Sequence, residues 1–164
     1  MTTIRHAQHN DFAAIARLEV SAGELFADTH MAWAVGETTD ADDLADAAAA
    51  GLLWVAEGQD EIVGFLLAEI FSADLHIWEV AVHRGWQNQG IGRALVETAL
   101  IAGAVQGCNR ATLTTDRTLP WNAPYYARLG VIEFAESDRP ARLSAQLASE
   151  PMSHLRCAMG RVLV

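Results

Sequence analysis

Two closely spaced glycines, Gly90 and Gly92, stand in a polar segment between two apolar stretches. The segment Gln87–Gly92 follows an apolar run of strand length, Leu75–Val82, and precedes a helical pattern that extends to Val105. Glycine has no Cβ, so the backbone can approach a ligand closely at both glycines. The first amides of a helix have no partner within the helix and lie at its positive dipole end. The pattern therefore favours a phosphate or pyrophosphate at this turn.

A plain tight connection between a strand and a helix has the same glycine spacing, and the spacing alone does not decide between the two interpretations. The dinucleotide-binding fingerprint needs a third glycine at the position where Leu95 stands. The GK[ST] sequence of a P-loop is also missing. Both a plain Rossmann site and a nucleoside triphosphatase site are therefore disfavoured.

The composition indicates one compact domain over residues 1–164. The chain has 164 residues, of which 51% are hydrophobic, and this is enough to bury a core. A formal net charge of -10 argues against a nucleic-acid-binding surface and suits a cationic small molecule or peptide. Cys108 and Cys157 lack the spacing of metal ligands, so we interpret them as packed free thiols in a reducing cytoplasm and expect no metal site.

The chain gives no sign of export or of membrane insertion. The N-terminal residues have no apolar segment of signal-peptide type, and the chain has no run of about 18 apolar residues. We therefore expect a cytoplasmic protein that has no membrane partner.

Hydrophobic periodicity and turn residues predict alternating strands and helices along the whole chain. Asn10 is the expected N-cap of the first helix, which carries Phe12, Ile15, Leu18 and Ala22 toward the core. The expected strands are 2–6, 52–57, 62–70, 75–82, 110–115, 131–134 and 155–164. The expected helices begin near residues 11, 40, 91, 123 and 141, and the last four end near residues 50, 105, 129 and 149.

Two motifs resemble those of the GCN5-related N-acetyltransferase superfamily. One is the strand, turn and helix around Gln87–Gly92, and the other is Asn122 followed by Tyr126–Gly130. The resemblance implies a single-domain α+β fold with a central, mixed, mostly antiparallel twisted sheet of about six or seven strands and about four or five flanking helices. It also implies acetyl transfer from acetyl-CoA to a primary amine, by direct attack in a ternary complex.

The resemblance assigns the cofactor-binding residues. It places the pyrophosphate at the turn and at the first helical amides, and it pairs the pantetheine arm with the backbone of the preceding strand, at a bulge where that strand splays from its neighbour. The corresponding positions in this chain are Val80, Ala81, Val82, Gln87, Asn88, Gln89, Gly90, Ile91, Gly92, Arg93, Ala94, Asn122 and Tyr126.

Glu79 and Tyr126 are the candidate catalytic residues. An amine is mostly protonated at neutral pH, so a base assists the attack, and Glu79 is the only charged residue in an otherwise apolar run. We expect desolvation in that strand to raise the pKa of Glu79, although the residue also fits a purely structural role. Tyr126 corresponds to the family's tyrosine beside the thioester sulfur, where a phenol with an ordinary pKa of about 10 can protonate the leaving thiolate. Tyr125 is the rival, and its spacing to Leu129 favours it less.

The acceptor is less well defined than the cofactor. Asp28, Trp33 and Glu79 are the candidate acceptor-binding residues, although Asp28 and Trp33 also fit a solvated helix end. We expect a small cationic amine; the alternatives are a protein N-terminus or lysine, and a non-catalytic acyl-CoA sensor. The apolar tail and the five tryptophans also suit a homodimer. The chain departs from the family's usual proline and phenylalanine at Arg84 and Val131, which we expect to change loop shape more than activity.

Overall fold

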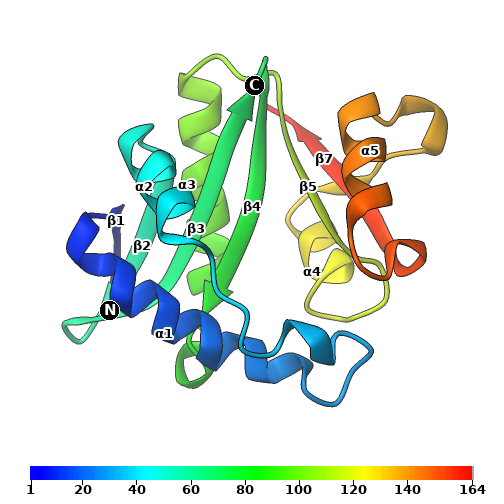
Figure 1. The fold of residues 1–164 in the computed structure, drawn as a ribbon. Helices are drawn as coiled ribbons and strands as arrows, with labels where there is room; N and C mark the ends of the chain where they lie inside the picture. The colour runs from blue at the N-terminus through cyan, green and yellow to red at the C-terminus, as the bar shows by residue number, and fades with distance from the viewer. Residues whose placement is uncertain (164) are drawn as a thin grey trace. The chain divides into compact units, whose positions relative to one another are not determined.

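The computed structural model describes residues 1–163, in which seven strands form one sheet (Figure 1). The strands are β1 (Thr2–His6), β2 (Leu53–Gly58), β3 (Glu61–Phe71), β4 (Asp74–Val82), β5 (Arg110–Asp116), β6 (Ile132–Glu133) and β7 (Arg156–Val162). Their order in the sheet is β1-β2-β3-β4-β5-β7-β6. The pair β4–β5 is parallel, whereas β1–β2, β2–β3, β5–β7 and β6–β7 are antiparallel. The mixed, mostly antiparallel sheet that we predicted is therefore confirmed.

Five α-helices accompany the sheet in the described residues. They are α1 (Phe12–Gly23), α2 (Ala41–Ala49), α3 (Ile91–Val105), α4 (Ala123–Arg128) and α5 (Ala141–Ser149). Short 3-10 turns are η1 (His9–Asp11), η2 (Glu24–Phe26), η3 (Ala32–Ala34), η4 (Arg84–Trp86), η5 (Glu136–Asp138) and η6 (Ser153–Leu155). None of the helices in residues 1–163 is both long and apolar enough to cross a membrane.

The described chain divides into two compact units. The first unit is formed by Met1–Glu69 and Glu79–Ile101, and the second by Ile70–Trp78 and the residues from Ala102 onward. Strand β4 and helix α3 each contribute to both units. That all 164 residues act as one domain stays a prediction.

In the first unit, helices cover both faces of the sheet (Figure 1). Helices α1 and α2 bury their apolar stripes, including Ile15 and Leu44, against Val55 and Phe65. Helix α3 lies on the other face, where a Cβ at Gly64 would come within 3.2 Å of the Leu95 side chain. The glycine therefore lets α3 approach the sheet closely.

The start of α1 differs from the prediction. Asn10 lies inside η1 and does not cap α1. Asp11 is instead the N-cap residue of α1, although its side chain makes no capping hydrogen bond to that helix. Its Oδ2 accepts a hydrogen bond of 2.8 Å from the Gln8 backbone amide as part of the capping box of η1. Asp11 also forms an ion pair with Arg5, and this contact, more than any other, lowers the pKa of the carboxyl.

In the second unit, β5 is central. It pairs with β4 from Asp74↔Arg110 to His76↔Thr112 and with β7 along its whole length. Helix α5 packs Leu143 and Leu147 onto Ala158 of β7 (Figure 1).

Both cysteines lie in the second unit and are buried free thiols, as we predicted. Burial raises the pKa of Cys108, and it raises the pKa of Cys157 to about 11.

Candidate active site

The connection between β4 and α3 is held by backbone hydrogen bonds and by the side chains of His83 and Gln87. The His83 amide donates to Val63 O at 2.8 Å and continues the pairing with β3 for one residue. His83 then closes η4, because its carbonyl accepts from the Trp86 amide and its Nδ1 accepts from the Gly85 amide at 3.1 Å. Gln87 Nε2 donates to Val82 O at 3.1 Å, so the end of the strand is tied to the start of the turn.

Two residues with left-handed backbone conformation turn the chain into α3. Asn88 has φ 61° and Gly90 has φ 81°, a region that glycine and asparagine tolerate best. The Ala94 amide donates to Gly90 O at 3.0 Å, which is the first hydrogen bond between residues four apart in α3. The amides of Ile91, Gly92 and Arg93 come before it and belong to the first turn, where helical amides have no partner within the helix. Asn88, Gln89 and Gly90 are exposed. The turn therefore has the features of an anion-binding helix N-terminus.

The preceding strand residues lie between core and solvent. Ala81 is buried in the core of the first unit, and Val80 and Val82 are half-buried. Glu79 is exposed, so burial in an apolar strand does not supply the desolvation that we expected there. The sequence argument was wrong at this point because the run of three buried residues in β4 ends at Ile77, and Trp78 and Glu79 are both exposed.

The connection between β5 and α4 is held by side chains. Asp116, at the end of β5, is 1% exposed, and its Oδ1 accepts hydrogen bonds from the backbone amides of Thr118 and Leu119. Asn122 Nδ2 donates to Thr115 Oγ1 at 2.8 Å, which fixes the orientation of the amide. The Asn122 Oδ1 atom is buried and has no hydrogen-bond partner. An acceptor of this kind fits a ligand N–H group.

Tyr126 lies in α4, directly after this connection. Its backbone amide donates to Asn122 O at 3.1 Å, so the helix starts from the pinned asparagine. Tyr125 and Tyr126 are both half-buried, and their rings meet edge to face at 5.3 Å. The Arg128 guanidinium lies 5.6 Å from the centre of the Tyr125 ring. Gly130, with φ 77°, ends the segment.

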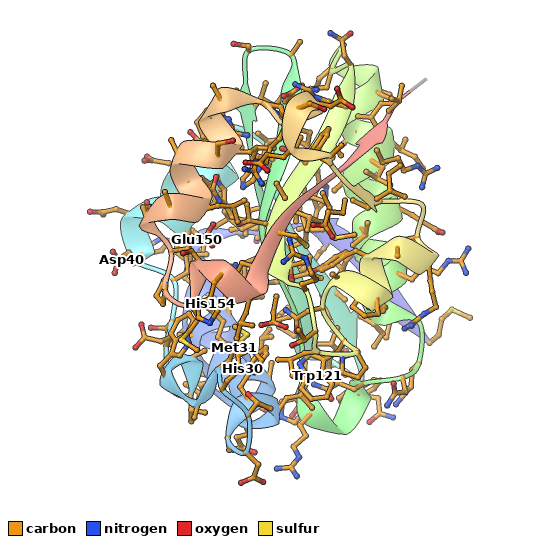
Figure 2. The ribbon with its side chains drawn as sticks, turned by 90° about the vertical axis from the view of Figure 1, so that its right-hand side faces the viewer. His30, Met31, Asp40, Trp121, Glu150 and His154 are labelled. Carbon is orange, nitrogen blue, oxygen red and sulfur yellow. The ribbon has the colours of Figure 1, made fainter. Side chains whose placement is uncertain are left out.

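The candidate acceptor residues lie in the segment between α1 and α2. Asp28 and Trp33 are both exposed, and Met31 between them, which is labelled in Figure 2, is buried. The far end of the segment is anchored by Glu19 of α1, whose carboxylate accepts from the Thr39 amide at 3.0 Å and from Thr39 Oγ1 at 2.9 Å. Burial raises the pKa of Glu19, which is 8% exposed.

The predicted site residues fall into two groups. Asp28, Trp33 and Glu79–Ala94 belong to the first unit, whereas Asn122 and Tyr126 belong to the second. Within the described residues, no cluster of three or more His, Cys, Asp or Glu side chains is arranged to hold a metal ion.

Sequence reasoning missed the side chains that support the second group. Asp116 and Thr115 hold the β5–α4 connection. Glu150, which is labelled in Figure 2, forms an ion pair of 2.8 Å with Arg156. Glu150 Oε2 also accepts from Thr114 Oγ1 at 3.2 Å. Of these contacts only that between Thr114 and Glu150 joins residues far apart in the chain, whereas the bonds of Asp116 to Thr118 and Leu119 form a local turn that its sequence position could have indicated.

The comparisons with known proteins decide the family. Residues 7–131 match the acetyltransferase (GNAT) family, and this range contains all of the predicted site residues. The chain belongs to the acetyltransferase (GNAT) family. The resemblance inferred from the two motifs is thus confirmed, and so is the prediction that the protein is an acetyltransferase.

Solved structures with the same fold cover almost the whole acetyltransferase chain. The PaiA N-acetyltransferase of Thermoplasma acidophilum, in complex with coenzyme A, has a TM-score of 0.78 at 13% identity, with 99% of both chains covered. The putative acetyltransferase YncA of Salmonella typhimurium, with acetyl-CoA, has a TM-score of 0.72 at 21% identity, with 100% of this chain and 95% of that chain covered. The ribosomal-protein-S18-alanine N-acetyltransferase of Escherichia coli has a TM-score of 0.71 at 18% identity, with 99% and 94% covered. These similarities establish the GNAT fold.

Proposed function

We propose that this acetyltransferase transfers the acetyl group of acetyl-CoA to a primary amine, and that the amine is a small cationic molecule. The main support is the β4–α3 connection, where a left-handed glycine opens a 15-residue helix directly after a strand. Solved structures of the same fold that contain coenzyme A or acetyl-CoA support the choice of donor.

The described residues fit the donor at two places. The exposed turn Asn88–Gly90 and the first amides of α3 can hold the pyrophosphate, because a helix N-terminus attracts anions. The pinned amide of Asn122, with its unpaired Oδ1, can accept an N–H group of the pantetheine arm. The backbone of Val80–Val82 is the proposed partner of the same arm.

Glu79 and Tyr126 are the proposed proton carriers. Acetyl-CoA supplies an activated thioester carbonyl. The amine nitrogen forms a bond to this carbonyl carbon while the carbon–sulfur bond breaks. Glu79, directly or through a water molecule, takes the proton that the amine loses, and the Tyr126 hydroxyl gives a proton to the leaving sulfur. The exposure of Glu79 suits a base that must exchange its proton with solvent after each turnover.

The charge distribution supports a cationic acceptor. Fifteen carboxylates and four arginines belong to the first unit, whereas six carboxylates and seven arginines belong to the second. The acidic surplus therefore lies entirely in the unit that holds Asp28 and Glu79. A negative surface raises the local concentration of ammonium ions and their association rate.

We also propose that the protein is cytoplasmic and that it forms a homodimer. The buried free thiols Cys108 and Cys157 support the location because such thiols suit a reducing compartment. Exposed apolar side chains on β6 and β7, Ile132 and Val162, support the dimer.

The decisive experiment measures acetyl-CoA-dependent thiol release over a panel of polyamines, aminoglycosides, amino acids and short peptides. We expect one class of small amines to react, and Tyr126→Phe to lower kcat about tenfold or more. Tyr125→Phe is the matched control and should stay within about twofold of the wild type. Glu79→Gln should lower the rate for the same acceptors. Coenzyme A binding without turnover of any amine would contradict the proposal and favour a sensor, and turnover of peptides alone would favour a protein acceptor.

A further inference from the structure

The segment between α1 and α2, residues 24–38, is a surface loop whose two ends lie close together. Figure 1 shows it leaving the end of α1 and returning to α2. A Cβ placed on Gly23 would lie 3.8 Å from the Gly36 amide nitrogen. Loops of this length with adjacent ends are compact units that often carry function. We call this segment the acceptor loop, because it carries Asp28 and Trp33.

The acceptor loop is ordered from within by one threonine. Thr29 Oγ1 donates to Phe26 O at 2.8 Å and accepts from the Met31 amide at 3.0 Å. The Met31 side chain is buried, whereas Asp28 and Trp33 on either side of it are exposed. These local bonds shape the loop, but they do not fix how its second end is attached to α1. That attachment depends on contacts outside the loop.

A buried carboxylate of α1 holds the second end of the acceptor loop. Glu19 is 8% exposed, and both of its carboxylate oxygens lie 3.0 Å from the Thr39 amide nitrogen. Its Oε2 also accepts from Thr39 Oγ1 at 2.9 Å. Burial raises the pKa of Glu19, and the bonds from Thr39 oppose this shift. Because burying a charge is unfavourable unless hydrogen bonds compensate for it, the contact with Thr39 is what makes this carboxylate tolerable here.

One face of α1 contacts both ends of the acceptor loop. Glu19 and Gly23 are four residues apart in α1 and therefore lie on the same face of the helix. This face approaches the loop at Gly36, which has φ 83°, and holds Thr39 through the Glu19 carboxylate. The Glu19–Thr39 contact therefore closes the loop against the helix.

We propose that the Glu19–Thr39 contact positions Asp28 and Trp33 for the acceptor amine, so that Glu19 is a positioning residue of this acetyltransferase. The inference rests on the proposed function, which assigns Asp28 and Trp33 to the acceptor. A loop already held in its binding conformation loses less entropy when the ligand binds, so the contact should lower KM for the acceptor. The β4–α3 connection has its own internal bonds, and its exposed ion pair from Arg84 to Glu24 lies at the other end of the loop. KM for acetyl-CoA should therefore depend little on Glu19.

The kinetic test compares variants that remove or keep the contact. Glu19→Ala should raise KM for the most reactive amine of the acceptor panel about fivefold and change KM for acetyl-CoA less than about twofold. Glu19→Gln should have a smaller effect, because its amide can still accept from the Thr39 amide and donate to Thr39 Oγ1. Asp46→Ala, which removes an exposed carboxylate of α2, is the control and should change neither KM. Equal losses in Glu19→Gln and Glu19→Ala would show that the charge itself attracts the acceptor, and would overturn the inference.

Hydrogen exchange separates this inference from the proposed function, because it needs no substrate. In Glu19→Ala, peptides from the acceptor loop should exchange about tenfold faster than in the wild type, and peptides from α3 should be unchanged. This result would support the Glu19–Thr39 contact as the support of the loop even if no amine turned over, an outcome that would contradict only the proposed function.

Three results would overturn the inference. Equal acceleration in the acceptor loop and in α3 would indicate general unfolding, and no acceleration in the loop would show that Glu19 does not hold it. Faster exchange in the loop with an unchanged KM for a reactive amine would show that the loop does not position the acceptor.

Discussion

The two strand–turn–helix connections of this acetyltransferase, β4–α3 and β5–α4, differ in the groups that they present. The β4–α3 connection is tied at its start by His83 and Gln87, and the left-handed residues Asn88 and Gly90 then lead into the helix. The β5–α4 connection uses the side chains of Asp116 and Asn122, which bond to backbone amides and to Thr115. The first connection leaves exposed backbone near a helix N-terminus. The second fixes the orientation of Asn122, one of the proposed site residues.

This difference explains what each connection can contribute. A turn with an exposed glycine directly before a helix can bring main-chain amides close to an anion, because glycine has no side chain at that point. A turn held by side-chain bonds restricts the position of the helix that follows it. Tyr126 lies one helical turn after Asn122, and its amide donates to the Asn122 carbonyl. We infer that binding depends most on the first connection, and the rate of the chemical step most on the second.

The largest effect should come from breaking the side-chain connection. Asp116→Ala removes a buried carboxylate that accepts from Thr118 and Leu119, so two backbone amides lose their partner. We expect the free energy of unfolding to fall by about 2 to 4 kcal/mol in urea titrations. The control Asp138→Asn changes an exposed carboxylate of η5 and should have almost no effect. A loss below about 1 kcal/mol for Asp116→Ala would show that the connection does not depend on its side chains.

The backbone connection should respond through binding. Gly90→Ala places a Cβ at φ 81°, where residues other than glycine are strained, although no atom lies within 4 Å of the new carbon. We expect KM for acetyl-CoA to rise about tenfold, with a smaller change in kcat. Gly85→Ala is the matched control in the same turn, because its Cβ would meet only His83 at 3.5 Å. Equal effects of both substitutions would contradict a special role for the left-handed glycine.

Asn122 tests both roles at once, because it is part of the β5–α4 connection and is also proposed to bind acetyl-CoA. Asn122→Ala should raise KM for acetyl-CoA about fivefold, because the pantetheine arm loses its acceptor. Thr115→Val keeps the asparagine and removes only its anchor at 2.8 Å, so its effect should be smaller. Thr115→Val in the Asn122→Ala background should add little, and full additivity in this double-mutant cycle would show that the two side chains act independently.

The smallest effect on stability near neutral pH should come from His76. This residue of β4 pairs with Thr112 of β5, and both lie in the strands that lead into the two connections. Its pKa is lowered to about 3, so below an unfolded value of about 6.5 the unfolded chain takes up a proton that the folded chain does not bind. The stability contributed by His76 is therefore present above about pH 6.5 and decreases by about 1.4 kcal/mol for each pH unit below it. Urea titrations from pH 7 to pH 4.5 measure this slope. His76→Asn should remove it, and an unchanged slope would contradict the neutral imidazole.

The fold could be predicted from the sequence wherever one stretch of chain contains the whole signal. Helix α5 was predicted at its observed bounds, Ala141–Ser149, and the strand before the glycine turn was predicted to within one residue of β4. Predictions failed at an element boundary. Asp11, and not Asn10, is the N-cap residue of α1, and its carboxylate bonds to Arg5 and to the Gln8 amide instead of to the helix.

The candidate site shows the same limit. Gly90 and Tyr126 were found because turn glycines and helical spacing are local features of the sequence. Glu150 was missed because its contact with Thr114 lies 36 residues away, whereas Asp116 was missed although its bonds to the next amides form a local aspartate turn. Glu79 was found for a reason that the structure does not support, since an apolar neighbourhood in sequence did not make the carboxylate buried.

The buried cysteines also decide how this enzyme can be assayed. Disulfide reagents that reveal free coenzyme A react with thiolates, and Cys157 is buried with a pKa raised to about 11. Cys108 is likewise buried, and its pKa is raised. The folded enzyme therefore contributes almost no background colour to a continuous assay. A slow second rise in colour, after the product signal has levelled off, would report unfolding in the same cuvette.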